Sequence, residues 1–226
     1  MVNTAKPITI YSNRACPYAQ RALIALYETG LEHELVEIPL PNKPSWYLDI
    51  NPEGKVPALK YGDDILAESL VIAEFITDLS DKSFLPQDPL KRAQARFAIE
   101  FWGSKIVPIL YRLLRVSDSA EIDTTTNELV EHLKRFNALL AAQSDGPYFF
   151  GDQYSLVEIV LSPFIGRLAP TVKFARINIP KTPELTRFHS WTAEILERPS
   201  FQKSSLSAEE LYEKTEQLAT KIRALA

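Results

Sequence analysis

The spacing of apolar residues changes once along this chain, and that change limits the folds it can adopt. In the first third, short apolar runs alternate with helical stretches: residues 8–11 are apolar, 20–29 have a helical period, and 34–38 have the composition of a strand. Residues 56–66 then predict a β-hairpin, and 69–78 return to the helical period. This order of elements predicts a small mixed sheet flanked by helices.

The remainder of the chain has the pattern of a helical bundle. Residues 80–89, crowded with Asp, Lys and Pro, are typical of a linker. Beyond them apolar residues recur at helical spacing, over 97–114 and again over 129–140. Residues 155–158 and 207–210 have the Ser-to-Glu spacing of a capping box, which begins a helix. We therefore predict an α/β domain over residues 1–80, a linker over 81–90 and an all-α domain over 91–226.

Composition and charge exclude several classes of partner. The 226 residues are 46% hydrophobic, enough for a buried core, and 25 basic against 29 acidic residues leave a net charge of −4. Such a balance offers no long-range attraction to nucleic acid or to an anionic membrane. Residues 1–7 lack the apolar stretch of a signal peptide, and no run is long enough to cross a bilayer. With three scattered histidines and one cysteine, we expect a cytoplasmic protein with no metal site, no internal disulfide, and no nucleic-acid or membrane partner.

Cys16, the one cysteine, lies where the first apolar strand gives way to a helix. The first turn of a helix presents unpaired backbone N–H groups and the positive end of the helix dipole, which favour the reactive thiolate over the thiol. Pro17 suits that first turn, and Arg14 and Arg21 add positive charge nearby in sequence. A lone cysteine is most often a small buried hydrophobe, but a packing cysteine needs no such strand, loop and Cys-Pro arrangement. Because position 19 is alanine, redox chemistry needs its second thiol from a small molecule or a partner protein.

Four ordered motifs connect the chain to a known family. They are Ala-Cys-Pro-Tyr-Ala-Gln-Arg at 15–21, Asn-Lys-Pro-Ser-Trp at 42–46, Asn-Pro-Glu-Gly-Lys-Val-Pro-Ala-Leu at 51–59, and Glu-Ser at 68–69. With these motifs the chain resembles the cytosolic glutathione transferases, and within them the omega-like class, which carries cysteine where most relatives use tyrosine or serine. The resemblance implies a thioredoxin-like N-terminal domain followed by a helical bundle, the glutathione transferase fold. It further implies glutathione as co-substrate and a homodimer.

The resemblance assigns glutathione contacts to residues in these motifs. Val56 is expected to offer a strand-like edge to the cysteinyl part of the tripeptide, with a cis bond before Pro57 turning that backbone toward the ligand. Ser69, at the start of a helix, is expected to bind the γ-glutamyl carboxylate, and Glu68 the ammonium group. From local sequence alone, Ser69 reads more readily as a helix cap and Glu68 as a first-turn acid.

Five further residues complete the predicted site. Lys43 matches the family's lysine for the glycyl carboxylate, and Lys55, just before the strand-like edge, is expected to assist it. Tyr18 lies on the first helical turn beside the thiol, where packing is the default role of a tyrosine. Trp102 and Tyr111 are candidates for a hydrophobic site between the domains, although aromatic residues at helical spacing belong more often to a core.

Three functions of unequal weight follow. In the first, the Cys16 thiolate attacks a glutathione mixed disulfide, or reduces a dehydroascorbate-like or phenacyl-glutathione substrate, and takes the glutathionyl group onto itself. A second glutathione then releases that group as the disulfide. In the second, the cleft between the domains binds glutathione conjugates or flat hydrophobic and aromatic molecules with little turnover. The third, conjugation of glutathione to halogenated aromatics, is weaker because position 16 lacks a hydroxyl, for which Tyr11 or Ser12 would have to substitute.

Overall fold

Strand β1 is the centre of the sheet in the N-terminal part. The computed structural model describes residues 6–225, so most of the stretch on which the prediction of no signal peptide rests lies outside the described residues. β1 (Ile8–Ser12) pairs in parallel with β2 (Glu34–Glu37) and antiparallel with β3 (Ala58–Tyr61), and β3 turns into the antiparallel β4 (Asp64–Ala67). The strand order is β2-β1-β3-β4, which confirms the predicted mixed sheet.

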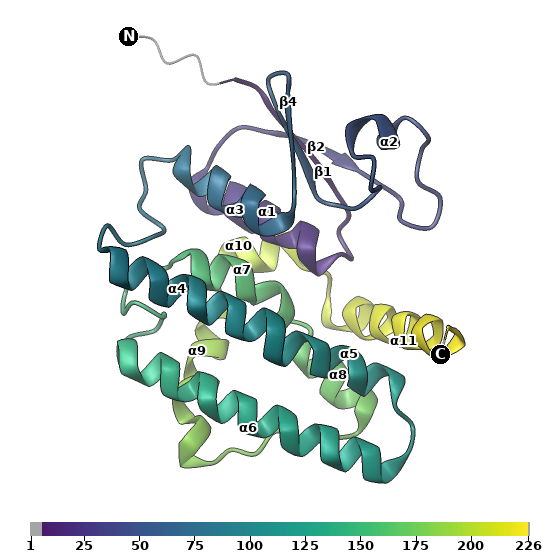
Figure 1. Cartoon of the computed structure of the whole chain (residues 1–226), viewed down its shortest axis with the longest axis vertical. Helices are drawn as coiled ribbons and strands as arrows, with labels where there is room; N and C mark the ends of the chain where they lie inside the picture. The colour runs from purple at the N-terminus through teal and green to yellow at the C-terminus, as the bar shows by residue number, and fades with distance from the viewer. Residues whose placement is uncertain (1–5, 226) are drawn as a thin grey trace.

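Helix α1 (Pro17–Thr29) is buried on all sides over most of its length. It begins with Pro17 and ends at Gly30, whose φ of +76° suits glycine and whose N–H donates to the Leu26 carbonyl. Every residue from Ala19 to Leu26 is buried. The reason is that the sheet packs against one side of α1 and helices of the C-terminal part pack against the other (Figure 1).

Two more helices complete the N-terminal part. α3 (Ser69–Asp78) packs beside α1 and covers the same side of the sheet (Figure 1). The short α2 (Tyr47–Ile50) lies in the long segment between β2 and β3. Within the sheet, Ile10 of β1 stands opposite Leu35 of β2 and Leu59 of β3.

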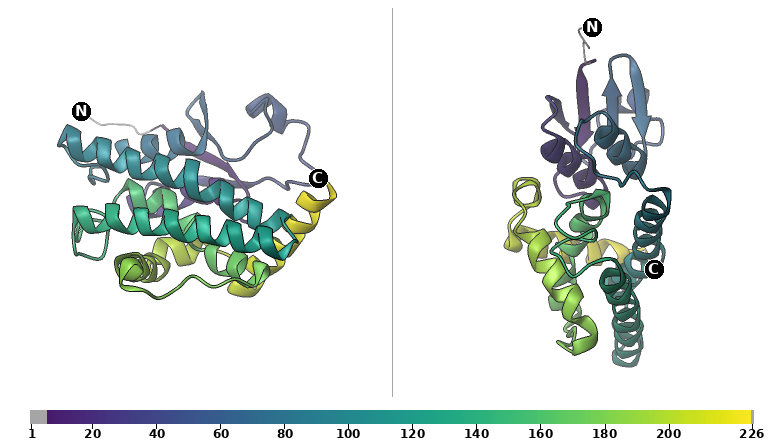
Figure 2. Two further views of the ribbon diagram at one scale, coloured as in Figure 1. Left: turned by 60° about the horizontal axis from the view of Figure 1, so that its bottom comes forward. Right: turned by 90° about the vertical axis from the view of Figure 1, so that its left-hand side faces the viewer.

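The C-terminal part contains helices and no strand within the described residues. α4, η1 and α5 follow one another as one long rod, in which a π-helical turn precedes Pro108, and α6 lies alongside that rod (Figure 1). Figure 2 shows the sheet at one end of the molecule and these helices at the other. No helix within residues 6–225 is long and apolar enough to cross a membrane. The elements are α4 (Pro89–Phe101), η1 (Trp102–Ile106), α5 (Val107–Arg115), α6 (Ser119–Gln143), α7 (Leu156–Ile165), α8 (Leu168–Ala175), η2 (Pro183–Leu185), α9 (Thr186–Leu196), α10 (Pro199–Ser204) and α11 (Ala208–Ala224).

Polar side chains fix where several of these helices begin. The Asp88 carboxylate caps α4 by accepting a hydrogen bond from the Lys91 N–H at 2.8 Å. Residues 89–90, the last two of the predicted linker, therefore belong to the first turn of α4. Both predicted capping boxes are confirmed, Ser155 with Glu158 at the start of α7 and Ser207 with Glu210 at the start of α11.

Glu158 also holds the bundle together beyond its own helix. Its carboxylate is fully buried and accepts hydrogen bonds from the Phe149 N–H at 2.7 Å and from Trp191 Nε1 at 2.9 Å. Burial raises the pKa of Glu158, while the hydrogen bonds act in the opposite direction. Glu158, the glutamate of the capping box, thus ties α7 to α9 and to the segment before α7.

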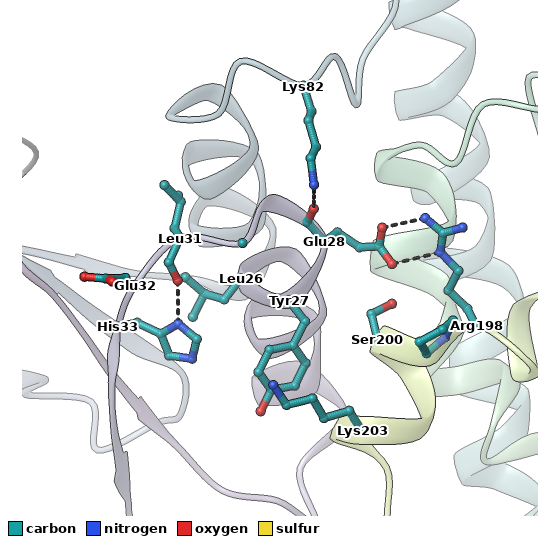
Figure 3. A pocket seen from close by; sticks show the side chains of 12 residues that line it. Leu26, Tyr27, Glu28, Leu31, Glu32, His33, Lys82, Arg198, Ser200 and Lys203 are labelled. Atoms are coloured by element: carbon teal, nitrogen blue, oxygen red, sulfur yellow. Dashed lines mark hydrogen bonds and ion pairs between the residues drawn. The ribbon is translucent and has the colours of Figure 1, made fainter.

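An ion pair fastens the C-terminal end of α1 to the helical part. Arg198 donates from Nε to Glu28 Oε1 at 2.9 Å and from Nη2 to Oε2 at 2.7 Å (Figure 3). Lys82 Nζ donates to the Glu28 backbone oxygen at 2.5 Å, which satisfies a carbonyl that the helix leaves free at its end. Burial raises the pKa of Glu28, but hydrogen bonds from Arg198 and Ser200, together with the charges of Arg198 and Lys82, outweigh burial and leave that pKa below its usual value.

We expect Glu28→Gln to lower the free energy of unfolding at pH 7 by about 2 kcal/mol, because it leaves Arg198 without a carboxylate in a partly buried site. The Arg198 side chain is 32% exposed, which keeps the loss below that of a fully buried pair. Because folding lowers the pKa of Glu28, its contribution is present above the ordinary value of 4.5 and is lost as the pH falls through the folded value.

Urea unfolding of both proteins across this pH range measures the effect, and the gap between them should narrow below pH 4.5. The matched control is Glu184→Gln, which removes one of the two carboxylate partners of Lys134 from a more exposed pair. It should change the free energy of unfolding by less than about 0.5 kcal/mol. A gap for Glu28→Gln that does not vary with pH would contradict the assignment.

Candidate functional site

Cys16 is the residue that precedes α1, with the extended backbone of a helix cap at φ −85° and ψ 119°. Its N–H donates to the Asn13 carbonyl at 3.0 Å, and its own carbonyl accepts from the Gln20 N–H at 3.0 Å, which closes the first turn. The thiol is half-buried, and Sγ lies 3.9 Å from the Val56 carbonyl oxygen. The predicted place of the thiol, between strand and helix, is therefore confirmed.

The loop that carries Cys16 is held from both sides. Asn13 Oδ1 accepts from the Ala15 N–H at 3.0 Å, while Asn13 Nδ2 donates to the Ile38 carbonyl at 2.9 Å. Arg167, between α7 and α8, donates from Nη2 to the Ala15 carbonyl at 2.9 Å. A side chain from the helical part thus reaches the residue next to the thiol.

The thiol opens onto a cavity of about 490 Å³, a size usual for a small-molecule site. All eight residues predicted to bind glutathione or to react line this one cavity, although they come from four separate motifs. They are Cys16, Tyr18, Lys43, Lys55, Val56, Pro57, Glu68 and Ser69.

One wall of the cavity is the segment before β3. The Val56-Pro57 peptide bond is cis, as predicted. The carbonyl of the preceding Lys55 accepts from Tyr47 Oη at 2.6 Å and from Asn51 Nδ2 at 2.9 Å. These two hydrogen bonds fix the backbone that leads into Val56, beside the thiol.

The two predicted lysines differ in how much charge they offer. Lys55 Nζ pairs with Glu53 Oε2 at 2.5 Å, and both side chains are mostly exposed. Lys43 forms no ion pair within the described residues, and its side chain lies along Gly54, whose φ is +63°. A side chain at position 54 would meet Leu48 and Lys43. The freer ammonium group is therefore that of Lys43.

Glu68 and Ser69 line the cavity where β4 gives way to α3. Ser69 is the first residue of α3 and is buried, while Glu68 before it is exposed. Glu68 has φ 69° and ψ 117°, a conformation that costs a non-glycine residue energy and that is most frequent at functional sites. This backbone turn places the start of α3 at the cavity.

Two guanidinium groups lie near the thiol, that of the buried Arg21 and that of the half-buried Arg167. Arg21 donates to the Val160 carbonyl and Ser69 Oγ, and Arg167 donates to Gln20 Oε1 at 2.8 Å as well as to Ala15. Burial lowers the pKa of each to about 10, and the neighbouring Cys16 acts to raise it. Neither forms an ion pair with a carboxylate in residues 6–225.

Arg14 does not have the role predicted for it. Its side chain is exposed and donates from Nη2 to the Ser205 carbonyl at 3.3 Å, while its backbone N–H donates to Glu37 Oε1. The backbone just before the helix turns this side chain toward the start of α11. The charge near the thiol comes from Arg21, which the sequence indicated, and from Arg167, which no local sequence signal marks, because it lies in the other half of the chain.

The two aromatic candidates, Tyr111 and Trp102, lie in different surroundings. Tyr111 of α5 lines a second, small cavity of about 80 Å³ next to Ala15 and Pro17, with Phe164 and Arg167 on its other walls. Burial raises the pKa of Tyr111 to about 12, so its phenol is protonated at neutral pH.

The prediction that Trp102 lines a cleft is wrong. Its side chain is fully buried and packs among Phe136, Phe188 and Trp191, with ring centroids 5.0 to 6.4 Å apart. Its helical spacing reflects the core of the bundle.

The two residues that could substitute a hydroxyl for the thiol, Tyr11 and Ser12, have little exposed surface. Ser12 is fully buried, and Tyr11 is 9% exposed and packs against Tyr47.

In residues 6–225 no three His, Cys, Asp or Glu side chains come together in a way that could hold a metal ion. Tyr18 keeps its packing role, with its ring centroid 5.2 Å from that of Phe164 in an edge-to-face arrangement, while it also lines the Cys16 cavity.

Comparison with known proteins gives the same picture. Residues 15–79 match the family model "Glutathione S-transferase, N-terminal domain", and residues 119–194 match "Glutathione S-transferase, C-terminal domain". Glutathione S-transferase omega-1 of Sus scrofa is 30% identical over 197 residues, 85% of this chain and 78% of that protein.

Solved structures agree with this. Glutathione transferase Omega 2C from Trametes versicolor has a TM-score of 0.80 at 31% identity, over 95% of this chain and 99% of that one. Rice GST1, solved in complex with glutathione, has a TM-score of 0.84 at 26% identity, over 96% and 98% of the two chains. With its thioredoxin-like sheet domain and helical C-terminal domain, the chain belongs to the glutathione S-transferase family and is a glutathione transferase.

Proposed function

We propose that this glutathione transferase is a thiol transferase and reductase in which Cys16 carries the glutathionyl group as a mixed disulfide. The observation that supports this most directly is the surroundings of the Cys16 sulfur. It is half-buried at a helix N-terminus, on the wall of a cavity, with Arg21 and Arg167 behind it. The similarity to omega-class relatives supports the same reading.

The two guanidinium groups favour an anionic sulfur. A buried charge is stable only when an opposite charge and hydrogen bonds compensate it. The oxygen atoms that accept from Arg21 and Arg167 are neutral, so they satisfy hydrogen bonds and leave the charge uncompensated. A thiolate at Cys16, together with carboxylates of a bound ligand, would supply the negative charge. The free N–H groups of the first turn of α1 act in the same direction.

The cavity has groups suited to each part of glutathione. The backbone of Val56 runs beside the thiol and can pair with the cysteinyl residue. Ser69 and the first turn of α3 suit the γ-glutamyl carboxylate, and Glu68 suits the ammonium group. Lys43 is the better partner for the glycyl carboxylate, because Glu53 already neutralises Lys55.

The reaction needs two glutathione molecules. The Cys16 thiolate attacks the glutathionyl sulfur of a mixed disulfide, its S–S bond breaks, and the other thiol leaves as a thiolate. A second glutathione, losing its proton to that thiolate, attacks the same glutathionyl sulfur and leaves as glutathione disulfide, which restores Cys16. With phenacyl-glutathione the first step breaks a C–S bond instead, and the departing enolate takes the proton. Since the cycle consumes reduced glutathione, we place the protein in the cytosol.

The other two functions have less support. Conjugation through a substitute hydroxyl needs Tyr11 or Ser12 at the ligand, and both side chains are buried. Storage of flat aromatic molecules has one candidate place, a cavity of about 790 Å³ with Pro170, Leu196 and Phe201 on its walls, but neither Cys16 nor Tyr111 lines it, and the cavity at Tyr111 has only about 80 Å³. The cavity at Cys16 has charged residues on its walls.

We also infer that two copies of the chain pair through β4, α3 and α4. These elements carry apolar side chains that are 39% to 67% exposed, namely Ile65, Leu70, Val71, Leu90 and Phe97. An ion pair between Glu74 of α3 and Arg96 of α4 links these two helices. An exposed apolar surface that extends over neighbouring elements is typical of a protein interface.

Replacing Arg167 should slow the alkylation of Cys16. At pH 7 we expect Arg167→Gln to react with iodoacetamide roughly three- to tenfold more slowly than the wild type, because a nearby positive charge that favours the thiolate is lost. Arg14→Gln, with its charge directed away, is the control and should leave the rate unchanged. Equal rates for Arg167→Gln and wild type at pH 7 would contradict the electrostatic role.

Replacing the thiol should abolish the reaction. We expect Cys16→Ser to lose thiol transferase turnover by at least about a thousandfold, because a serine hydroxyl stays protonated and forms no disulfide. Intact-mass spectrometry after treatment with glutathione disulfide should show one glutathionyl adduct on the wild type, removed by glutathione, and none on Cys16→Ser. The control Ser69→Ala should still form the adduct, at a higher concentration of disulfide. Full turnover by Cys16→Ser would refute the proposed function.

Charges on the proposed interface should separate the dimer. We expect Val71→Asp with Phe97→Asp to halve the mass measured by light scattering after gel filtration, because each buries a carboxylate against an apolar partner surface. Leu35→Asp is the matched control, since Leu35 is 46% exposed on β2, at the opposite edge of the sheet. A mass unaffected by the double substitution, or halved by Leu35→Asp alone, would be inconsistent with this interface.

A further inference from the structure

Arg21 carries a buried charge that lies near two groups of the cavity, the Cys16 sulfur and the Ser69 hydroxyl. The residue is 5% exposed. Its Nε donates to the Val160 carbonyl at 3.0 Å, and its Nη1 donates to Ser69 Oγ at 3.1 Å. The guanidinium carbon lies 4.8 Å from the Phe164 ring centroid and 5.4 Å from that of Tyr18. Packing and hydrogen bonds therefore hold this group in one place.

The contact with Arg21 decides which way the Ser69 hydroxyl can point. A serine hydroxyl has one hydrogen to donate and two lone pairs that accept. Since one lone pair accepts from Arg21, the O–H bond must point away from the guanidinium. Ser69 lines the Cys16 cavity at the first residue of α3, so its hydrogen and the N–H groups of that turn are available to an acceptor in the cavity.

The charge of Arg21 favours an anionic acceptor there. A carboxylate that accepts from Ser69 would lie one hydroxyl group away from a buried cation that no described carboxylate neutralises. In a medium of low polarity this attraction is stronger than at the surface. Arg167, by contrast, makes its contacts with Ala15, Gln20 and Pro163, away from Ser69.

We propose that Arg21 is the positioning residue for the γ-glutamyl carboxylate: it orients the Ser69 hydroxyl toward that carboxylate and supplies the buried charge that the carboxylate neutralises. The proposal rests on the proposed function, because it requires glutathione in the Cys16 cavity. Selection for the γ-glutamyl carboxylate then depends on Arg21 of α1, a residue that need not touch the ligand.

Binding of two ligands to wild type and variants tests this without turnover. The first is S-methylglutathione, whose thioether cannot undergo thiol exchange. The second is the same molecule with 4-aminobutyryl in place of γ-glutamyl, which lacks only the γ-glutamyl carboxylate. By calorimetry we expect Arg21→Gln to weaken S-methylglutathione roughly 10- to 100-fold, the usual effect of losing a hydrogen-bonded charge. Binding of the 4-aminobutyryl ligand should change by less than about twofold.

Ser69→Ala provides a second variant that leaves the Arg21 charge and the packing of α1 in place. It should lose discrimination between the ligands in the same way, and adding Arg21→Gln to it should then weaken S-methylglutathione less than in the wild type. Arg167→Gln is the matched control, a second guanidinium near Cys16, and should leave the ratio of the two affinities unchanged.

Two results would overturn the proposal. One is a loss for Arg21→Gln that is equal for both ligands, which would make Arg21 a merely structural residue. The other is a Ser69→Ala protein that discriminates as well as the wild type. Failure of the wild type to bind S-methylglutathione at all would refute the proposed function and this inference with it, whereas binding without selective loss would refute this inference alone.

Discussion

Because α1 is enclosed on both sides, each polar side chain on its buried stretch must find its partner inside the protein. Gln20 donates to Ser204 Oγ at 3.1 Å and accepts from Arg167, Arg21 bonds to Val160 and Ser69, and Glu28 near the end pairs with Arg198. Most of these partners belong to the helical part. The helix that begins just after Cys16 is therefore fixed in position by contacts along its whole length.

This arrangement links the reactivity of the thiol to the packing of the two parts of the chain. Arg21 approaches Cys16 from within α1, whereas Arg167 reaches the Ala15 carbonyl from between α7 and α8. The positive surroundings of the sulfur are complete only while the helical part is docked against α1. A local opening of that interface, a motion well below the cost of global unfolding, would hydrate both guanidinium groups and weaken their effect on the sulfur. Stability at the interface and chemistry at Cys16 therefore depend on the same contacts.

Sequence patterns predicted what is periodic or local, and they failed where contacts join distant segments. The change of apolar period predicted the mixed sheet and the helical bundle, and the capping boxes at Ser155 and Ser207 marked helix starts, because these signals lie within one element. The four residues of α2 are too few for a period to appear. Closeness in sequence also did not predict which charges lie near the Cys16 thiol, because Arg14 turns toward Ser205.

The composition of the site shows the same division. The motifs brought eight residues to one cavity because each motif fixes its own turn of backbone. Arg167 could not be predicted, because only the docking of the helical part places it 2.9 Å from the Ala15 carbonyl. Trp102 was misassigned because an aromatic residue at helical spacing has the same sequence pattern in a core as at a cleft, and only its 0% exposure separates the two.

Buried charge, rather than volume, separates the candidate site from a larger cavity at the other end of α1. The opposite end of α1 borders a cavity of about 970 Å³, twice the size of the one at Cys16 (Figure 3). Its cations are either paired or exposed to water: Arg198 pairs with the Glu28 carboxylate, whereas Lys82, which donates to the Glu28 carbonyl, and Lys203, which lies over the Tyr27 ring at 4.0 Å, are both exposed. An anion entering there would have to compete with contacts that the fold already makes. At Cys16 the guanidinium groups have only neutral partners, so a thiolate or a carboxylate gains their full attraction.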